Sequence, residues 1–237
     1  MGRFATVANR MASSAQARAK RFTKLARELM VSARNGSDPE TNSALRLAID
    51  KAKASNMPKD NIERAIKKGS GELKGQNFET VIYEGYGPKG TALIIETLTD
   101  NKKRTTPSIK VILQKNQGHL GEIGSVAWIF QKKGILLVSK ENASEEKLMD
   151  LTLDIGAEDI VLEDENFSIY SSFENFSHVK DSLTKNNIPL IHGDIELLPE
   201  NFVELDEENY EVAMHLIEKL EEHEDVQKVY HNCICKT

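Results

Sequence analysis

The stretch Lys133-Gly134-Ile135-Leu136-Leu137-Val138 opens the part of the sequence that decides the fold, which runs to residue 198. An apolar strand is followed by Ser144, a helix-capping residue with Glu145 and Glu146 in the first turn behind it. Periodic apolar patterns then place strands at 135–138, 160–162, 167–170 and 191–197, and helices at 145–155 and 173–187. The order strand-helix-strand-strand-helix-strand predicts a ferredoxin-like α/β domain over residues 133–198.

The segments on either side of this stretch are each incomplete. Residues 76–132 contain strands at 81–86, 91–98 and 126–130 and a helix that starts at Thr106-Pro107. Residues 199–237 contain only a helix near 206–222 and a last strand near 226–233. A lone helix and strand need a sheet to join, so we expect 76–132 and 199–237 to form one discontinuous α/β domain that carries residues 133–198 as an insertion.

The first 75 residues have a helical pattern instead. Gly36 ends a first amphipathic helix, Asp38-Pro39 starts a second, and Pro58 starts a third that stops before Gly69 as its C′ residue. Three such helices with short links can bury their apolar faces only on one another, which predicts a three-helix bundle, with a linker after it at 70–77. The fold class is therefore α+β and multidomain: an N-terminal three-helix bundle plus two α/β (ferredoxin-like) domains, the second inserted in the first.

The charge of the chain is divided unevenly along its length. The net charge is −6, yet residues 1–75 carry 16 Lys or Arg against 7 Asp or Glu, and residues 76–237 carry 15 against 30. A basic segment of this kind is typical of a partner rich in phosphate, and the alternative is a set of solvated helix faces. The candidate nucleic-acid-binding residues here are Arg3, Arg10, Arg18, Lys20, Arg21, Lys24, Arg27, Lys51, Lys53, Lys59, Arg64, Lys67 and Lys68.

Two further segments resemble phosphate-binding loops. Lys102, Lys103 and Arg104 lie between a strand end and a helix start, where cations can hold a nucleic-acid backbone or can simply be solvated beside a turn. The glycines of Gly85-Tyr86-Gly87-Pro88-Lys89-Gly90 match a dinucleotide-binding pattern, but they lie between two strands, where no helix N-terminus is available for phosphate. We expect this second segment to be a tight turn.

Other classes of function find less support. No apolar run is long enough to span a membrane, and the two cysteines, Cys233 and Cys235, make free thiols the expectation. The histidines are scattered, and no Ser/His/Asp set, metal site or cofactor motif is evident, so we expect neither an enzyme nor a bound cofactor. The less favoured alternative is a metal-dependent enzyme with an acidic cleft between the α/β domains, for which the conceivable members are Glu158, Asp159, Asp164 and Asp100.

Several motifs taken in order resemble one known family. They are Phe22-Thr23-Lys24-Leu25, Asn56-Met57-Pro58-Lys59-Asp60-Asn61-Ile62-Glu63-Arg64-Ala65-Ile66, Tyr83-Glu84-Gly85-Tyr86-Gly87-Pro88, Leu98-Thr99-Asp100-Asn101 with Arg104-Thr105, Gly124-Ser125-Val126, Lys133-Gly134 and Gly156-Ala157-Glu158-Asp159. Together they are similar to the YebC/PmpR family across nearly the whole chain. The resemblance implies three domains, a helical one followed by two α/β domains. The chain departs from the family at its extreme N-terminus, where the usual His-Ser-Lys-Trp start and the basic cluster after it are absent.

The resemblance also implies a function. Members are described as DNA-binding transcriptional regulators of the cytoplasm, and others, including the mitochondrial translational activator of cytochrome c oxidase, look like ribosome-associated translation factors. We therefore expect a cytoplasmic regulator of gene expression that binds nucleic acid through the basic N-terminal domain. The alternatives are a factor that binds ribosomal RNA, and a mitochondrial location if the Arg-, Ala- and Ser-rich N-terminus is a transit peptide.

Overall fold

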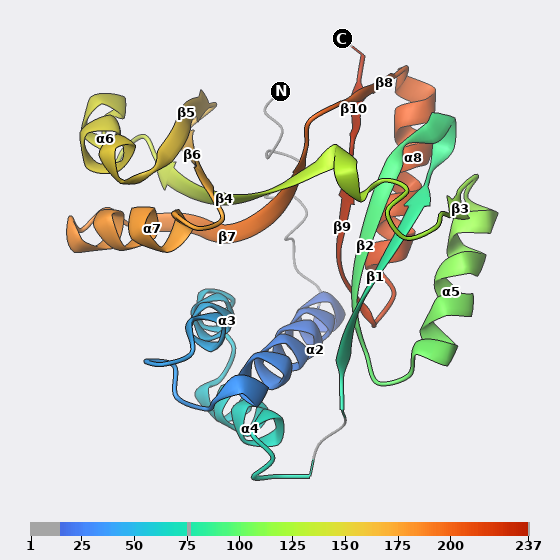
Figure 1. The fold of residues 1–237 in the computed structure, drawn as a ribbon, viewed down its shortest axis with the longest axis horizontal. Coiled ribbons are helices and arrows are strands. Elements are labelled where there is room, and N and C mark those ends of the chain that lie inside the picture. Colours follow the sequence, from blue (N-terminus) through green and yellow to red (C-terminus); the bar gives the residue numbers. More distant parts are fainter. Residues whose placement is uncertain (1–14, 75–76, 237) are drawn as a thin grey trace. The chain divides into compact units, whose positions relative to one another are not determined.

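The structure is a computed structural model that describes residues 15–74 and 77–236 (Figure 1). The helices, in chain order, are α2 (Ala15–Ser32), α3 (Ser43–Ala54), α4 (Lys59–Gly69), α5 (Lys102–Lys115), α6 (Glu145–Thr152), α7 (Phe176–Lys185) and α8 (Glu207–Glu221). The strands are β1 (Glu79–Tyr86), β2 (Ala92–Thr99), β3 (His119–Leu120), β4 (Phe130–Ser139), β5 (Ala157–Glu163), β6 (Asn166–Ser172), β7 (Leu190–Pro199), β8 (Val203–Leu205), β9 (Val226–His231) and β10 (Cys233–Cys235).

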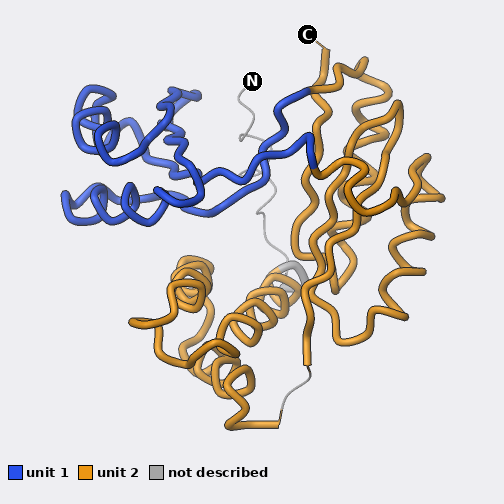
Figure 2. The backbone as a smooth tube through the Cα atoms, viewed as in Figure 1, with its two compact units in different colours: residues 1–12, 128–201 blue, residues 13–127, 202–237 orange. Residues whose placement is uncertain are grey.

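The described residues group into two compact units (Figure 2). Residues 128–201 form one unit, and the described residues of 13–127 and 202–237 form the other. The division of the second unit into a helical domain and an α/β domain, and the boundaries at 75, 132 and 198, stay predictions. No described helix is both long and apolar enough to cross a membrane.

The unit of residues 128–201 contains the six elements in the order that the sequence indicates, β4-α6-β5-β6-α7-β7. Its sheet has the strand order β5-β6-β4-β7, and every neighbouring pair is antiparallel. The two helices pack on each other and on the sheet, so Leu148 of α6 and Val179 and Leu183 of α7 are fully buried beside Ile169. The Ser144 side chain accepts the backbone N–H of Lys147, which confirms the predicted cap of α6.

The other unit contains a second antiparallel sheet, with the strand order β3-β1-β2-β9. The last long strand of the chain, β9, pairs with β2 through Ile94 and Tyr230 and their neighbours, so the C-terminal segment does join the sheet of residues 79–120. Helices α5 and α8 pack together over this sheet, where Leu113 and Leu216 are fully buried. Strands β8 and β10 form a separate parallel pair.

Helices α2, α3 and α4 bury their apolar stripes on one another, with Leu29, Leu45 and Ala52 completely inaccessible to solvent. Gly69 is the last residue of α4 and Ser70 follows it as the C-cap, so the prediction that Gly69 lies beyond the helix as C′ is wrong. A Cβ atom at Gly69 would overlap the backbone of Met30. This glycine therefore lies at a close approach of α4 to α2, a tertiary requirement that the sequence pattern does not reveal.

Two predicted helix starts are also wrong, for the same physical reason. Helix α3 begins at Ser43 and not at Asp38-Pro39, because the side chain of Asn42 accepts the N–H of Leu45 at 3.0 Å. Helix α5 begins at Lys102, because Asn101 accepts the N–H of Arg104 at 3.1 Å. The expected start at Pro107 lies inside that helix. In both cases an asparagine cap takes precedence over a nearby proline.

The strand predicted over Val126–Phe130 is wrong except for its last residue. Ala127–Ile129 form a short 3₁₀ turn, and Phe130 is the first residue of β4. The backbone N–H groups of Val126 and Ala127 both donate to the buried carboxylate of Glu84 at 2.8 Å. These two N–H groups are therefore bonded to a side chain and cannot also donate to a neighbouring strand.

Candidate nucleic-acid interface

Six of the predicted contacts are exposed and unpaired on the helical part of the chain (residues 15–74), and they lie on all three helices. None of them makes an ion pair with a carboxylate of the described residues. They are Arg18 and Lys20 on α2, Lys53 on α3, and Arg64, Lys67 and Lys68 on α4. The predicted contacts Arg3 and Arg10 lie outside the described residues. The exposed group can attract a polyanion because nothing in the described chain neutralises it.

The remaining predicted cations of these helices are paired with other residues or partly buried. Lys51 pairs with Glu28 at 2.9 Å, Lys59 pairs more loosely with Glu63 at 3.6 Å, and Arg21 is half-buried. Burial and the charges of Lys20 and Arg27 lower the pKa of Lys24, although Glu221 acts in the opposite direction. The Lys24 Nζ atom donates to the backbone carbonyl of Glu221 at 3.0 Å, so this lysine ties α2 to α8.

Arg27 has a structural role that the charge pattern conceals. Its side chain is about 10% exposed, and its Nη1 atom donates to Asp225 Oδ1 at 2.9 Å and to the carbonyl of Glu224. The guanidinium carbon also lies 5.0 Å from the ring centroid of Phe78. A buried and fully paired guanidinium cannot reach an external phosphate, so Arg27 is withdrawn from the predicted interface.

Asp225, on the loop between α8 and β9, is the shared partner of Arg27 on α2 and of two residues on α5. Its carboxylate is completely buried and accepts hydrogen bonds from Arg27, Arg104 and Thr105, the last at 2.7 Å. Burial alone would raise the pKa of Asp225, but the hydrogen bonds from Thr105 and Arg104 and the charges of both arginines outweigh it, and the net pKa is lowered. The carboxylate therefore joins α2, α5 and the α8–β9 loop as a permanent anion at neutral pH.

The cationic segment at the start of α5 is only partly free. Lys102 and Lys103 are exposed, whereas Arg104 donates to Asp100 and to Asp225, both at 3.0 Å. Asn101 caps the helix, so the segment is first of all a structural turn. Lys102 and Lys103 stay candidates for phosphate contact, and Arg104 is held by the protein's own acids.

A cavity of about 600 Å³ lies between α2, α4 and the segment that leads into β1. None of its lining residues is Asp or Glu. Its apolar surface comes from Phe22, Ala26, Met30, Met57, Ala65 and Phe78, and its polar surface from Thr23, Arg27, Asn61, Arg64, Lys68 and Lys74. The sequence analysis missed this cavity, although Phe22, Ala26 and Met30 are spaced four residues apart, which places them on one helix face.

The acids proposed for a metal-dependent enzyme have ordinary structural roles. Glu158 pairs with Lys133 at 2.6 Å, Asp159 accepts the N–H of Ile160, and Asp164 is in the β5–β6 turn with φ of 52°. Asp100 pairs with Arg104 in the other unit. Glu158, Asp159 and Asp100 each have a contact within their own unit, and nothing in those contacts resembles a catalytic pair.

Ser108 and His223 resemble a nucleophile and its base, since His223 Nε2 lies 2.9 Å from Ser108 Oγ. However, His223 Nδ1 accepts the backbone N–H of Asp225 at 3.1 Å. In the neutral ring Nε2 then carries the proton and donates to Ser108, so it cannot accept the hydroxyl proton. Burial is the main cause of a lowered pKa for His223, which favours this neutral form.

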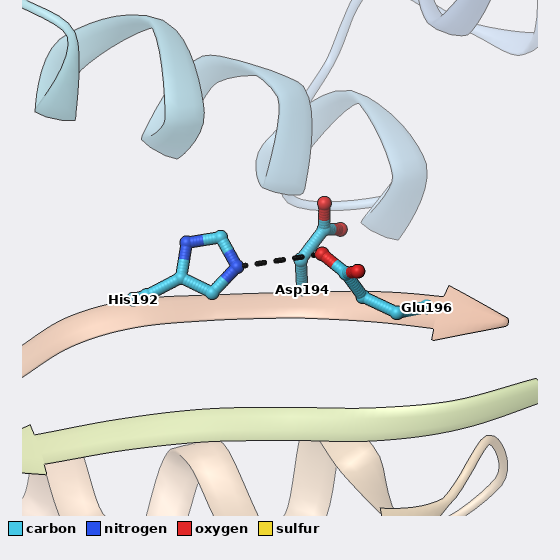
Figure 3. Close-up of side chains that lie close together, drawn as sticks. All are labelled: His192, Asp194 and Glu196. Atoms are coloured by element: carbon cyan, nitrogen blue, oxygen red, sulfur yellow. Dashed lines mark ion pairs between the residues drawn. The ribbon is translucent and has the colours of Figure 1, made fainter. Parts of the chain in front are cut away.

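A histidine and two carboxylates lie together on β7 in the unit of residues 128–201 (Figure 3). One ligand atom from each of His192, Asp194 and Glu196 falls within 4.8 Å of the others, and His192 Nε2 is 3.7 Å from Glu196 Oε1. The predicted strand alternation at 191–197 is the signal that could have found them, because alternate residues share a face. His192 and Glu196 thus make a long contact along one strand, which is an ion pair when His192 is protonated.

Glu84 is a structural residue that the sequence analysis did not single out. Its carboxylate is 7% exposed and accepts three backbone N–H groups, those of Gly124, Val126 and Ala127, at 2.7–2.8 Å. Burial would raise its pKa, and the three hydrogen bonds lower it further than burial raises it. Two of the motifs quoted above, Tyr83–Pro88 and Gly124–Val126, are therefore the two halves of one contact.

The fold and these contacts define a class of protein: a mixed α/β protein of two compact units, with exposed cations on three of its helices. Comparison with known families assigns it further. Residues 2–72 match the TACO1/YebC protein N-terminal domain, and residues 78–233 match the TACO1/YebC second and third domain. The chain belongs to the TACO1/YebC family, which confirms the resemblance drawn from the motifs.

Individual relatives agree over nearly the whole chain. A Clostridioides difficile protein named a probable transcriptional regulatory protein is 47% identical over 235 residues, which are 98% of each chain. A protein of the same name from Thermoanaerobacter pseudethanolicus is 50% identical over 213 residues, 89% of this chain and 87% of the relative. The crystal structure of a conserved hypothetical protein from Aquifex aeolicus is 42% identical, with a TM-score of 0.85 over 94% of this chain and 93% of that one.

Proposed function

We propose that this protein is a DNA-binding regulator of transcription that contacts phosphates through the exposed cations of α2, α3 and α4. The main supporting observation is that six of the predicted cations are exposed on these helices and have no carboxylate partner among the described residues. The relatives are named probable transcriptional regulatory proteins, which supports the same function. The bacterial relatives favour the cytoplasm as its location, and the family favours a binding protein over an enzyme.

The charge distribution also indicates which end of the chain binds. Residues 76–237 carry 15 Lys or Arg against 30 Asp or Glu, so this part repels a polyanion. Lys102 and Lys103 are its exposed exceptions at the start of α5. We infer that the helical part acts as a separate basic domain. We also infer from the strand order that residues 128–201 are the inserted ferredoxin-like domain. That domain is then free to contact partners other than the nucleic acid.

Ribosomal RNA is the alternative polyanion, and one observation favours it. The cavity beside Arg64 and Lys68 combines cations with an apolar floor, a combination that suits bases outside a regular duplex. Folded RNA displays such bases more often than B-form DNA does. Co-sedimentation with ribosomes, compared with binding to promoter DNA at physiological salt, separates the two targets.

The proposal is tested by the salt dependence of binding. Each phosphate contact releases counterions, so affinity falls steeply as salt is raised, and the removal of one contact lowers the slope by about one. We expect Lys67→Gln and Lys68→Gln each to reduce the slope for duplex DNA and structured RNA. Lys147→Gln on α6 is the matched control, because it removes an exposed lysine from the unit of residues 128–201. Equal slopes for all three variants and the wild type would overturn the assignment.

A further inference from the structure

We propose that the cavity between α2, α4 and the segment before β1 holds one unpaired nucleotide of a single-stranded nucleic-acid segment. The inference rests on the proposed function, because it names the part of the nucleic acid that the cationic surface selects. The volume, about 600 Å³, is in the range of small-molecule sites. The occupant is identified by two kinds of lining residue. The exposed cations Arg64, Lys68 and Lys74 are called the rim, and the half-buried or buried apolar side chains of Phe22, Ala26, Met30 and Met57 are called the floor.

The rim suits phosphate. Arg64 and Lys68 are one helical turn apart on α4, and Lys74 follows that helix in the chain. All three side chains are exposed, and none pairs with a carboxylate of the described residues. Arg27 also lines the cavity, but its charge is paired with that of Asp225, so it is not counted among the phosphate contacts. The unpaired positive charge at the cavity therefore comes from α4 and the residue that follows it in the chain.

The floor suits a base. Phe22, Ala26 and Met30 line it from α2, and Met57 lines it from the residues that precede α4. Phe22 is half-buried: it packs against the core of the three helices and also lines the cavity. Aromatic rings beside backbone-binding cations are the usual platform for bases of single strands. The side-chain amide of Asn61, which has no partner among the described residues, adds a donor and an acceptor for a base edge.

The occupant must be unpaired because a base in a duplex is stacked on both faces. It can enter a cavity only after it has left the stack, and that costs least for a bulged or single-stranded nucleotide. A ligand that carried phosphate alone would leave the apolar floor unused. RNA and DNA share the chemistry of base and phosphate, so both are used as probes.

The test compares two hairpins that have the same number of phosphates. One carries a single-nucleotide bulge with its base, and the other carries an abasic nucleotide at the same position. We expect the wild-type full chain to bind the first roughly tenfold or more tightly than the second, the lower part of the range expected for stacking of one base. The comparison is made once in RNA and once in DNA, and the larger ratio identifies the physiological source.

Substitutions test whether the preference for the hairpin with the base arises in the cavity. Phe22→Leu keeps an apolar side chain but removes the stacking ring, so the preference for the base should fall to about one, and Phe22→Tyr should keep it. Lys53→Gln, an exposed cation outside the cavity, should weaken both hairpins equally and leave the preference unchanged. Thermal unfolding of each variant confirms that the helical part is folded.

The outcomes separate this inference from the proposed function. Equal wild-type affinity for the base and abasic hairpins, with steep salt dependence for both, overturns the cavity site and leaves the cationic surface standing. A preference that survives in Phe22→Leu, with that variant folded, also overturns the site. Absence of binding to either hairpin overturns the cavity site and the proposed function together.

Discussion

Substitution of Asp225 by asparagine tests the cluster that ties the helices to the sheet. The change preserves the shape of the side chain but removes the negative charge that Arg27 and Arg104 share. Loss of one partner from a buried ion pair costs about 3–5 kcal/mol, because the other charge stays buried without compensation. Arg104 is about half exposed and recovers water, whereas Arg27 does not. We therefore expect Asp225→Asn to lower the free energy of unfolding by about 3 kcal/mol, the lower end of that range.

The assay is chemical denaturation followed by circular dichroism, with thermal unfolding as a second probe. For a protein of this size, about 3 kcal/mol corresponds to a fall in Tm of about 6–12 °C. Glu224→Gln is the matched control, because the Glu224 side chain is 66% exposed beside the same arginine. Removal of an exposed partner should change stability by at most about 0.5 kcal/mol.

The pH dependence provides a second, independent readout. The pKa of Asp225 is lowered in the folded protein, so its stabilising contribution is present above the unfolded value of about 3.9 and is lost as pH falls through the folded pKa. The stability difference between wild type and Asp225→Asn should be constant from pH 7 to about pH 5 and should shrink below about pH 4. A difference under about 0.5 kcal/mol at pH 7, or one that does not change on acidification, would refute the ion-pair account.

Three further predictions concern positions elsewhere in the same unit. Glu84→Gln should reduce stability by about 1.5–3 kcal/mol at pH 7, because it removes the charge that accepts three backbone N–H groups; denaturation midpoints that match the wild type at pH 7 would contradict this. Gly69→Ala should destabilise by about 1–3 kcal/mol through overlap with α2, although alanine favours helices; an increase in Tm would show that the helices are not in close contact there. At pH 8 a thiol reagent should modify the exposed Cys235 quickly and Cys233 only after unfolding, because burial raises the pKa of Cys233 to about 11; two fast equivalents, counted by mass spectrometry, would be the contrary result.

The elements of residues 128–201 could be predicted because their signals are local. Alternation along a strand and a serine followed by two glutamates depend only on neighbouring residues, and Ser144 caps α6 as expected. The errors occur where distant residues compete for the same backbone groups. The strand expected at 126–130 fails because Glu84, some forty residues earlier, takes the N–H groups of Val126 and Ala127.

The residues of the candidate interface could likewise be predicted only in part from the sequence. A count of charges locates a basic region, and the exposed cations of α4, such as Lys67, are found by that count alone. The count cannot separate Lys67 from Arg27, because the partner of Arg27 is Asp225, 198 residues away. Sequence spacing also cannot show that Phe22 and Arg64 line one cavity, since this depends on how α2 packs against α4.

The central claim is that the helical part carries the nucleic-acid contacts, and photochemical crosslinking of the full chain tests it most directly. The protein is bound to photoreactive RNA or DNA, irradiated and digested, and the crosslinked peptides are identified by mass spectrometry. We predict crosslinks in α2 and α4, with Phe22 and the peptides around Arg64 and Lys68 among them. Crosslinks confined to residues 128–201 would contradict the account.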